Sequence, residues 1–154
     1  MELKSIVERI PIFKGFSPDQ IEKMMSVSEE RTVQEGEYLF NEGDPSTCMY
    51  ILLSGGLQVL SISDTEIAVI TQMGVVGEMG VLTDQPRSAG VMANSNSRIL
   101  CISRDALFSL IQEDGSMGFK VYQNVTHILC DRLRENNILI EQQYLFLEDL
   151  TGEA

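Results

Sequence analysis

The chain has 154 residues, of which 44% are hydrophobic and 22% charged, a composition typical of one globular domain with a buried core. Eleven Lys and Arg stand against 23 Asp and Glu, so the formal net charge is −12. Such a surface repels nucleic acid phosphates and anionic membranes, and no apolar run reaches the roughly 18 residues of a membrane span. We therefore expect a cytoplasmic protein whose partners include neither nucleic acid nor membrane.

Residues 1–30 are predicted to be helical. Ser17 is a helix N-cap, Pro18 stands at the first helical position, and Gln20 is spaced to complete a capping box. The apolar residues that follow, beginning with Ile21, supply one buried face of the helix.

Residues 31–102 are predicted to form roughly six to eight short strands. Apolar runs such as 49–53 and 57–62 alternate with turn residues, among them Ser54-Gly55-Gly56 and Asn41-Glu42-Gly43. Short strands at this spacing are typical of an antiparallel sandwich or a jelly roll.

Residues 103–150 return to a helical period. Ser103 is the expected cap of a helix that ends near Gly115, and a longer helix runs from about Met117 toward Leu147, roughly 45 Å at 1.5 Å per residue. Its predicted apolar stripe is Tyr122, Val125, Leu129, Leu133, Asn136, Ile140, Tyr144 and Leu147. The second half is apolar on more than one side, so we expect part of it to overhang and to form a homodimer, the alternative being a helix folded wholly back on its own domain.

The residues that usually carry enzyme chemistry are sparse. Cys48, Cys101 and Cys130 are odd in number and widely spaced, as expected for reduced thiols, and His127 is the single histidine. Metal sites built from several imidazoles are thereby excluded. We predict neither an enzyme nor a metal or cofactor site; the competing cupin-type enzyme would need clustered metal ligands on its strands.

Arg87 is the only Lys or Arg between Thr32 and Ser97, a segment with eight carboxylates. It could form an ion pair with one of those acids, or its forked donors could bind two oxygens of an anionic ligand. The carboxylate of Glu78 only accepts hydrogen bonds, so beside a phosphate it would face a hydroxyl such as that of a ribose. A carboxylate for a sugar and an arginine for a phosphate together describe a nucleotide site.

This segment resembles the phosphate-binding cassette of cyclic nucleotide-binding domains, the sensors of the catabolite activator protein, the cAMP-dependent kinase and gated channels. The matching residues are Gly77-Glu78-Met79-Gly80-Val81-Leu82, followed after four residues by Arg87-Ser88-Ala89. Further matches in the family's order extend the resemblance over about residues 8–140. It implies an α+β, mainly β domain over 1–154: an N-terminal helical segment (1–30), a jelly roll or antiparallel double-stranded β-helix (31–102) with the cassette at 77–93, and two C-terminal helices (103–150), the last one long.

The resemblance also implies which residues bind the ligand, cAMP being favoured over cGMP. These are Gly77, Glu78, Met79, Arg87, Ser88, Ala89, Asn136 and Asn137. Glu78 would accept a hydrogen bond from the ribose 2′-hydroxyl, and Arg87 would pair with the cyclic phosphate, assisted by Ser88 and by the backbone N–H of Ala89. The long helix would close over the ligand as a lid, with its two asparagines at the base edge.

The last 14 residues hold four carboxylates and no Lys or Arg, so a DNA-reading helix-turn-helix is not expected after the long helix. The sequence thus predicts a stand-alone cyclic nucleotide sensor that signals through this helix to another chain, a second copy or another signalling protein. The alternative is a structural dimerisation module of the same fold, whose pocket is empty or holds an anion other than a cyclic nucleotide, and in which Glu78 and Arg87 pair with each other.

Overall fold

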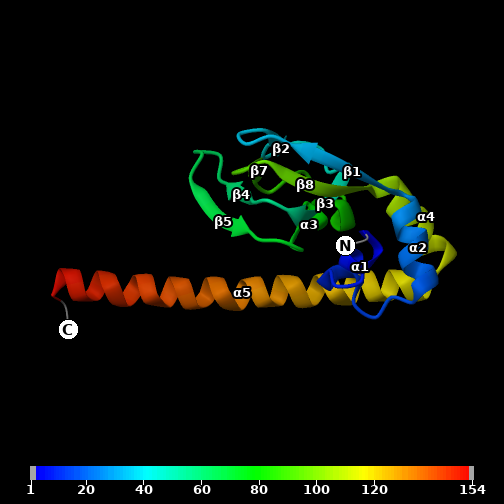
Figure 1. Cartoon of the computed structure of the whole chain (residues 1–154). Helices are drawn as coiled ribbons and strands as arrows, with labels where there is room; N and C mark the ends of the chain where they lie inside the picture. The colour runs from blue at the N-terminus through cyan, green and yellow to red at the C-terminus, as the bar shows by residue number, and fades with distance from the viewer. Residues whose placement is uncertain (1–2, 153–154) are drawn as a thin grey trace.

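The computed structural model describes residues 3–152 of the chain. Two four-stranded antiparallel sheets form a roll, shorter helices gather at one end of it, and one long helix runs beneath and extends past it (Figure 1). This arrangement confirms the predicted α+β jelly roll with N-terminal and C-terminal helices.

The strands form two sheets, ordered β1-β8-β3-β6 and β2-β7-β4-β5. Their bounds are β1 Ser28–Val33, β2 Tyr38–Phe40, β3 Cys48–Ser54, β4 Leu57–Leu60, β5 Glu66–Ile70, β6 Val75–Val76, β7 Gly90–Ala93 and β8 Ser97–Ser103. β3 and β4 correspond to the apolar runs predicted at 49–53 and 57–62. β1, however, begins inside the segment expected to be helical, because α2 ends at Ser26 and the next residues pair with β8 from Ser28↔Ile102 onward.

β3 lies between the two hydrophobic clusters of the molecule. Met49, Ile51 and Leu53 pack toward the helices, whereas Tyr50 and Leu52 pack toward the opposite sheet. Successive side chains of a strand point to opposite faces, so a strand covered on both sides needs apolar residues throughout. This explains why the sequence shows an uninterrupted apolar run here instead of an alternating one.

The helices are α1 Leu3–Val7, a short 3-10 helix η1 Pro11–Phe13, α2 Pro18–Ser26, α3 Glu78–Thr83, α4 Arg104–Glu113 and α5 Gly115–Thr151. The predicted capping box of α2 is present, since Ser17 Oγ accepts from the N–H of Gln20 and Gln20 Oε1 accepts from the N–H of Ser17. The predicted cap of α4 is also present, with Ser103 Oγ accepting from the N–H of Ala106.

The first half of α5 is fixed to the domain. Met117, Val121 and Val125 are buried among the other helices and one face of the first sheet. The buried Asn124 amide donates to the carbonyls of Ile12 and Lys14 at 2.8 and 2.9 Å. These contacts hold η1 and α5 together as one support for the roll.

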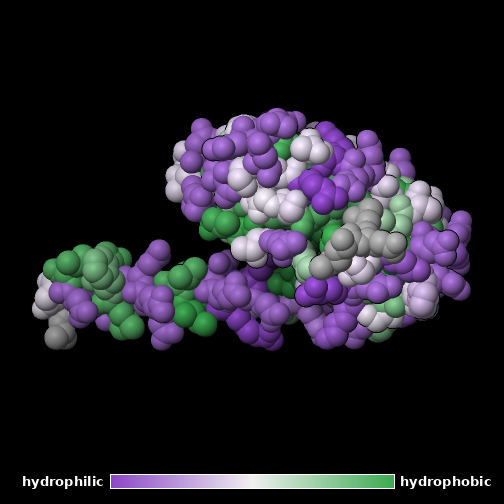
Figure 2. Space-filling model, viewed as in Figure 1, coloured by the Kyte–Doolittle hydropathy of each residue, from purple (hydrophilic) through white to green (hydrophobic). Residues whose placement is uncertain are grey.

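The second half of α5 extends beyond the roll. With 37 residues the helix is about 55 Å long, and every described residue from Leu133 onward is exposed. Figure 2 shows hydrophobic side chains on this overhanging part, as the sequence led us to expect. The predicted stripe faces the domain only in part: Val125 is buried and Leu129 packs against the core, but Tyr122 and the members from Leu133 onward are exposed. Within residues 3–152 no helix has the length and apolarity needed to cross a membrane.

Candidate functional site

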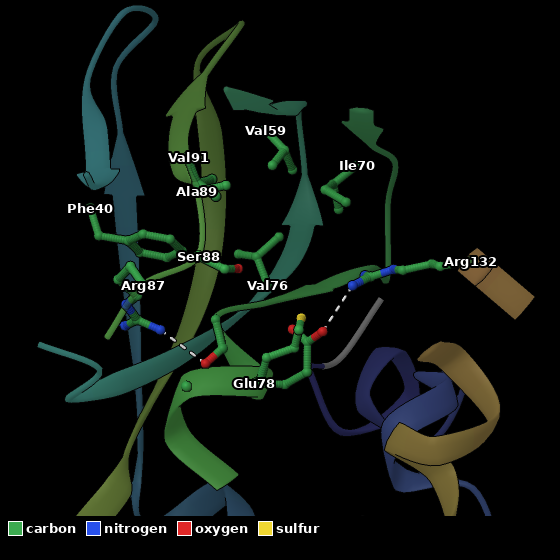
Figure 3. Close-up of a pocket in the computed structure, with 13 residues that line it drawn as sticks. Phe40, Val59, Ile70, Val76, Glu78, Arg87, Ser88, Ala89, Val91 and Arg132 are labelled. Atoms are coloured by element: carbon green, nitrogen blue, oxygen red, sulfur yellow. Dashed lines mark hydrogen bonds and ion pairs between the residues drawn. The ribbon is translucent and has the colours of Figure 1, made fainter. Parts of the chain in front are cut away.

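A cleft of about 90 Å³ opens between α3, the second sheet and α5. It is lined by Phe40, Val59, Ile70, Val76, Gly77, Glu78, Met79, Gly80, Arg87, Ser88, Ala89, Val91 and Arg132. Figure 3 shows Arg87 beneath Phe40 on the strand side, Glu78 on α3, and Arg132 reaching toward Glu78 from α5. Six of the eight predicted site residues therefore meet at one place.

Arg87 is held by backbone oxygens and an aromatic ring. Its Nη1 donates to the carbonyl of Gly77 at 2.9 Å, its Nη2 donates to the carbonyl of Cys48, and its Cζ lies 3.9 Å from the centroid of the Phe40 ring (Figure 3). Backbone hydrogen bonds from Arg87 N to Asp44 O and from Gly43 N to Arg87 O, each 2.8 Å, fix the main chain at this position. The loop after β2 thus sets where the guanidinium points.

The positive charge of Arg87 is not neutralised within the described part of the chain. Only 5% of the residue is exposed, no described carboxylate forms an ion pair with it, and its Nε is the one buried side-chain nitrogen or oxygen there without a hydrogen-bond partner. Burial also lowers the pKa of the guanidinium from its ordinary value. A desolvated cation with an unused donor is a site where an anion would be stabilised.

Gly77 is the N-cap of α3 and lies in the left-handed region, with φ +78°. A Cβ at this position would collide with Nη1 of Arg87 and would lie 3.1 Å from the carbonyl oxygen of Cys48. Glycine is therefore required both by the backbone angle and by the close approach of the guanidinium.

Glu78 is nearly fully buried, with 1% of the residue exposed, and it pairs with α5 instead of with Arg87. Its Oε1 accepts a hydrogen bond from Arg132 Nη1 at 2.8 Å, and Arg132 Nη2 donates to the carbonyl of Val75 at 2.6 Å (Figure 3). Burial raises the pKa of the Glu78 carboxyl, while the Arg132 guanidinium opposes the rise. The pairing of Glu78 with Arg87 expected for a purely structural module is thus not observed.

Arg132 is the site residue that the sequence analysis missed. It continues a second stripe of α5, after Val121, Val125 and Ile128, at intervals of four, three and four residues. A cation that follows directly on a buried apolar face is a signal that it reaches an acidic group of the same domain.

The remaining predicted residues divide into two groups. Ser88, Ala89 and Met79 line the cleft, with Ser88 and Met79 exposed at its mouth. Asn136 and Asn137 are exposed and line neither this cleft nor the neighbouring groove. Asn136 lies one helical turn beyond Arg132, where α5 has left the roll, so its contact with a base stays a prediction that requires α5 to move.

A second, larger groove of about 420 Å³ adjoins the cleft. The two share Ile70 and Arg132, and the groove is bounded by the segment after β5 and by α5, which contributes Asp131 and Glu135. Among residues 3–152 no group of three or more His, Cys, Asp or Glu side chains is placed to hold a metal ion.

Comparisons with known proteins point to one family. The sequence matches the family model for the cyclic nucleotide-binding domain over residues 30–114, more than half of the chain. A crystal structure of a cyclic nucleotide-binding domain from Methylobacillus flagellatus is similar, with a TM-score of 0.78 and 29% identity over 89% of this chain and 80% of that one.

Two relatives have longer sequences. A candidate potassium channel protein of Rhodopseudomonas palustris is 32% identical over 123 residues, 79% of this chain and 30% of that protein. The cyclic AMP receptor protein of Thermus thermophilus is 25% identical over 135 residues, 85% of this chain and 61% of that protein. This chain thus spans less than two thirds of either relative.

Proposed function

The chain belongs to the cyclic nucleotide-binding domain family, and from this premise we propose that it acts as one regulatory domain that binds a cyclic purine nucleotide in the cleft beside Arg87. Domains of this family are regulatory sensors, which confirms the prediction that the chain is not an enzyme. The observation that carries the proposal is the buried Arg87 guanidinium, whose charge is unpaired within residues 3–152 and whose Nε has no partner there.

The cyclic phosphate binds Arg87, and the ribose lies against Glu78. Arg87 uses one N–H of Nη1 and one of Nη2 for backbone carbonyls, so three of its five N–H groups, that of Nε and one on each Nη, remain to donate to phosphate oxygens. Glu78 uses Oε1 for Arg132, and because a carboxylate has two oxygens it can still accept a hydrogen bond from the ribose 2′-hydroxyl. Gly77, Met79, Ser88 and Ala89 form the rest of this sugar–phosphate pocket.

The base extends from the cleft into the adjoining groove. The cleft alone, at about 90 Å³, is smaller than typical ligand pockets of roughly 300–1,000 Å³, whereas cleft and groove together are large enough. Ile70 lies between the two and offers an apolar surface for a purine. We favour cAMP over cGMP, and the relative named as a cyclic AMP receptor supports this choice.

The output passes through α5 to a second copy of the chain in the cytoplasm. α5 borders the cleft through Arg132, so a bound nucleotide lies against the helix, and a ligand that prefers one position of α5 shifts the population toward it. A difference in affinity of about 100-fold between two positions amounts to about 2.7 kcal/mol.

The surface offered to the second copy is the exposed stripe of α5, which consists of Tyr122, Leu133, Ile140, Tyr144 and Leu147. The stripe holds no charged residue. Glu141 and Glu148 directly follow Ile140 and Leu147 and so point about 100° away from it. Two copies can therefore join their stripes without bringing like charges together, as helices do in a coiled coil. If sedimentation shows that the wild type is a monomer, the stripe is left to a different signalling protein.

The test is calorimetric titration of Arg87→Ala with cAMP and cGMP. We expect the variant to lose at least about 100-fold in affinity, because two or more charge-assisted hydrogen bonds to the phosphate disappear. Arg98→Ala is the matched control: it removes the same charge from an exposed arginine that pairs with Glu30 on the roll. It should bind like the wild type, and both variants should unfold cooperatively.

A thermal-shift series with cAMP, cGMP and cyclic dinucleotides separates the sensor from a structural module of the same fold. A true ligand raises the unfolding midpoint of the wild type in proportion to the logarithm of its concentration. Unchanged affinity in Arg87→Ala would place the ligand elsewhere, and no shift with any cyclic nucleotide would favour the structural module.

A further inference from the structure

Glu78 is a buried carboxylate that must remain ionised while an anion binds beside it. Two cations act on it: Arg132 from α5 and Arg87 from the segment before β7, together with its own backbone N–H. Burial raises the pKa of the carboxyl above its ordinary value, so without these partners it would protonate readily.

A nucleotide changes this balance. Its phosphate neutralises Arg87 and places a further negative charge near Glu78, and both effects favour protonation of the carboxyl. Arg132 is then the one cation of the two that stays available to Glu78. Both terminal nitrogens of its guanidinium are hydrogen-bonded: Nη1 lies 2.8 Å from Oε1 of Glu78, and Nη2 lies 2.6 Å from the carbonyl oxygen of Val75.

We propose that Arg132 is a positioning residue that holds Glu78 ionised and oriented for the ribose hydroxyl, so that α5 sets the pH range over which the site binds its nucleotide. This inference rests on the proposed function. It assigns to Arg132 control over the ionisation and orientation of Glu78, a role that differs from direct contact with the ligand. A protonated Glu78 would offer its remaining oxygen as a weaker acceptor, so the ligand would bind less tightly.

The test compares Arg132→Gln, Arg132→Lys and the wild type in calorimetric titrations with cAMP between pH 5.5 and pH 8. In Arg132→Gln the pKa of Glu78 is higher, so affinity falls at a higher pH as the solution is acidified. We expect its loss of affinity relative to the wild type to be about tenfold larger at pH 5.5 than at pH 8. Arg132→Lys keeps the charge and should restore most of the wild-type profile.

Arg134→Gln is the matched control. It removes the same charge two residues farther along α5, from an exposed side chain that pairs with Asp131. Its affinity profile should coincide with that of the wild type. The side chain of Arg132 is about one-third exposed, so Arg132→Gln is expected to fold, which cooperative thermal unfolding would verify.

A second readout needs no ligand: the titration of the Glu78 carboxyl carbon by NMR, which should move to higher pH in Arg132→Gln. An unchanged titration and an unchanged affinity profile would overturn the inference, as would higher affinity of Arg132→Gln at every pH, the behaviour of a residue that merely competes with the ribose. If instead the wild type bound no cyclic nucleotide at any pH, the proposed function would fail, while the NMR titration would still decide the role of Arg132.

Discussion

The two halves of α5 obey the same helical geometry but differ in where their apolar residues find partners. Between Met117 and Arg132 one face packs on the domain, and Asn124 donates to two carbonyls of the N-terminal segment. From Leu133 onward every described side chain is exposed, although many are large and apolar. The first half is therefore ordered by contacts within the domain, whereas the apolar side chains of the second half have no partner among residues 3–152.

The largest difference in unfolding free energy is expected between two variants that place the same charge in the first and in the second half of α5. Val121→Asp puts a carboxylate without a partner into the core, and we expect the free energy of unfolding to fall by about 4 kcal/mol. Ile140→Asp introduces the same charge on the exposed stripe and should change the unfolding of the monomer by less than about 0.5 kcal/mol. Urea denaturation at low protein concentration measures both.

The same pair tests what covers the exposed stripe. Sedimentation should show a dimer in the wild type and a weaker or absent dimer in Ile140→Asp, because the charge lies at the centre of the stripe. A monomeric wild type would leave the stripe to a different signalling protein. Equal destabilisation by the two variants would contradict the division of α5 into two halves.

A smaller effect is expected from the two asparagines that differ in burial. Asn124→Ala removes both hydrogen bonds to Ile12 and Lys14 and leaves the carbonyl of the buried Ile12 unsatisfied, so it should cost about 2 kcal/mol of unfolding free energy. Asn136→Ala changes an exposed residue and should leave the stability of the monomer within about 0.5 kcal/mol. Thermal and chemical denaturation at several protein concentrations measure these values.

The cAMP affinity and the dimerisation of Asn136→Ala also test whether the second half of α5 contacts the ligand or a second copy of the chain. A loss of cAMP affinity in this variant would mean that α5 closes over the cleft and brings Asn136 to the base. An unchanged affinity together with a changed stability or stoichiometry of the dimer would place Asn136 in the helix seam, where one polar residue specifies the register at a cost in stability.

What the sequence predicted depended on local signals. The caps at Ser17 and Ser103 are each read from a few consecutive residues, and both are present. The cassette is equally local, because Gly77, Glu78 and Arg87 need only a tight turn and a short helix to meet. β1 was missed because Ser-Glu-Glu-Arg-Thr-Val lies at the edge of a sheet with most of its side chains exposed, so it carries no apolar alternation.

The orientation of α5 could not be predicted, since the helix carries two stripes at intervals of three and four residues. One contains Tyr122, Leu133 and Ile140, the other contains Val121 and Arg132, and Val125 belongs to both. Periodicity alone gives both the same weight, and only the packing of the domain decides which is buried. Because the first stripe was chosen, Arg132 and its pairing with Glu78 escaped the sequence analysis.

Among the variants that should destabilise the monomer, the smallest change in unfolding free energy is expected for two glycines in the left-handed region of the backbone, one of which lies in the cassette. Gly77→Ala and Gly36→Ala each place a Cβ on a residue with positive φ, +78° and +83°, which costs about 1 kcal/mol of unfolding free energy. At Gly36 nothing lies within 4 Å of the new Cβ, so that cost is the whole effect. At Gly77 the new methyl group displaces the Arg87 guanidinium.

We therefore expect the two variants to differ more in ligand binding than in stability. Gly36→Ala should bind cAMP like the wild type. Gly77→Ala should lose about tenfold or more in cAMP affinity, because the Arg87 guanidinium that binds the phosphate is displaced. Thermal denaturation and calorimetric titration on the same samples separate the two quantities. Similar affinities in both variants would show that the position of Arg87, unlike the packing of the first half of α5, tolerates a shift.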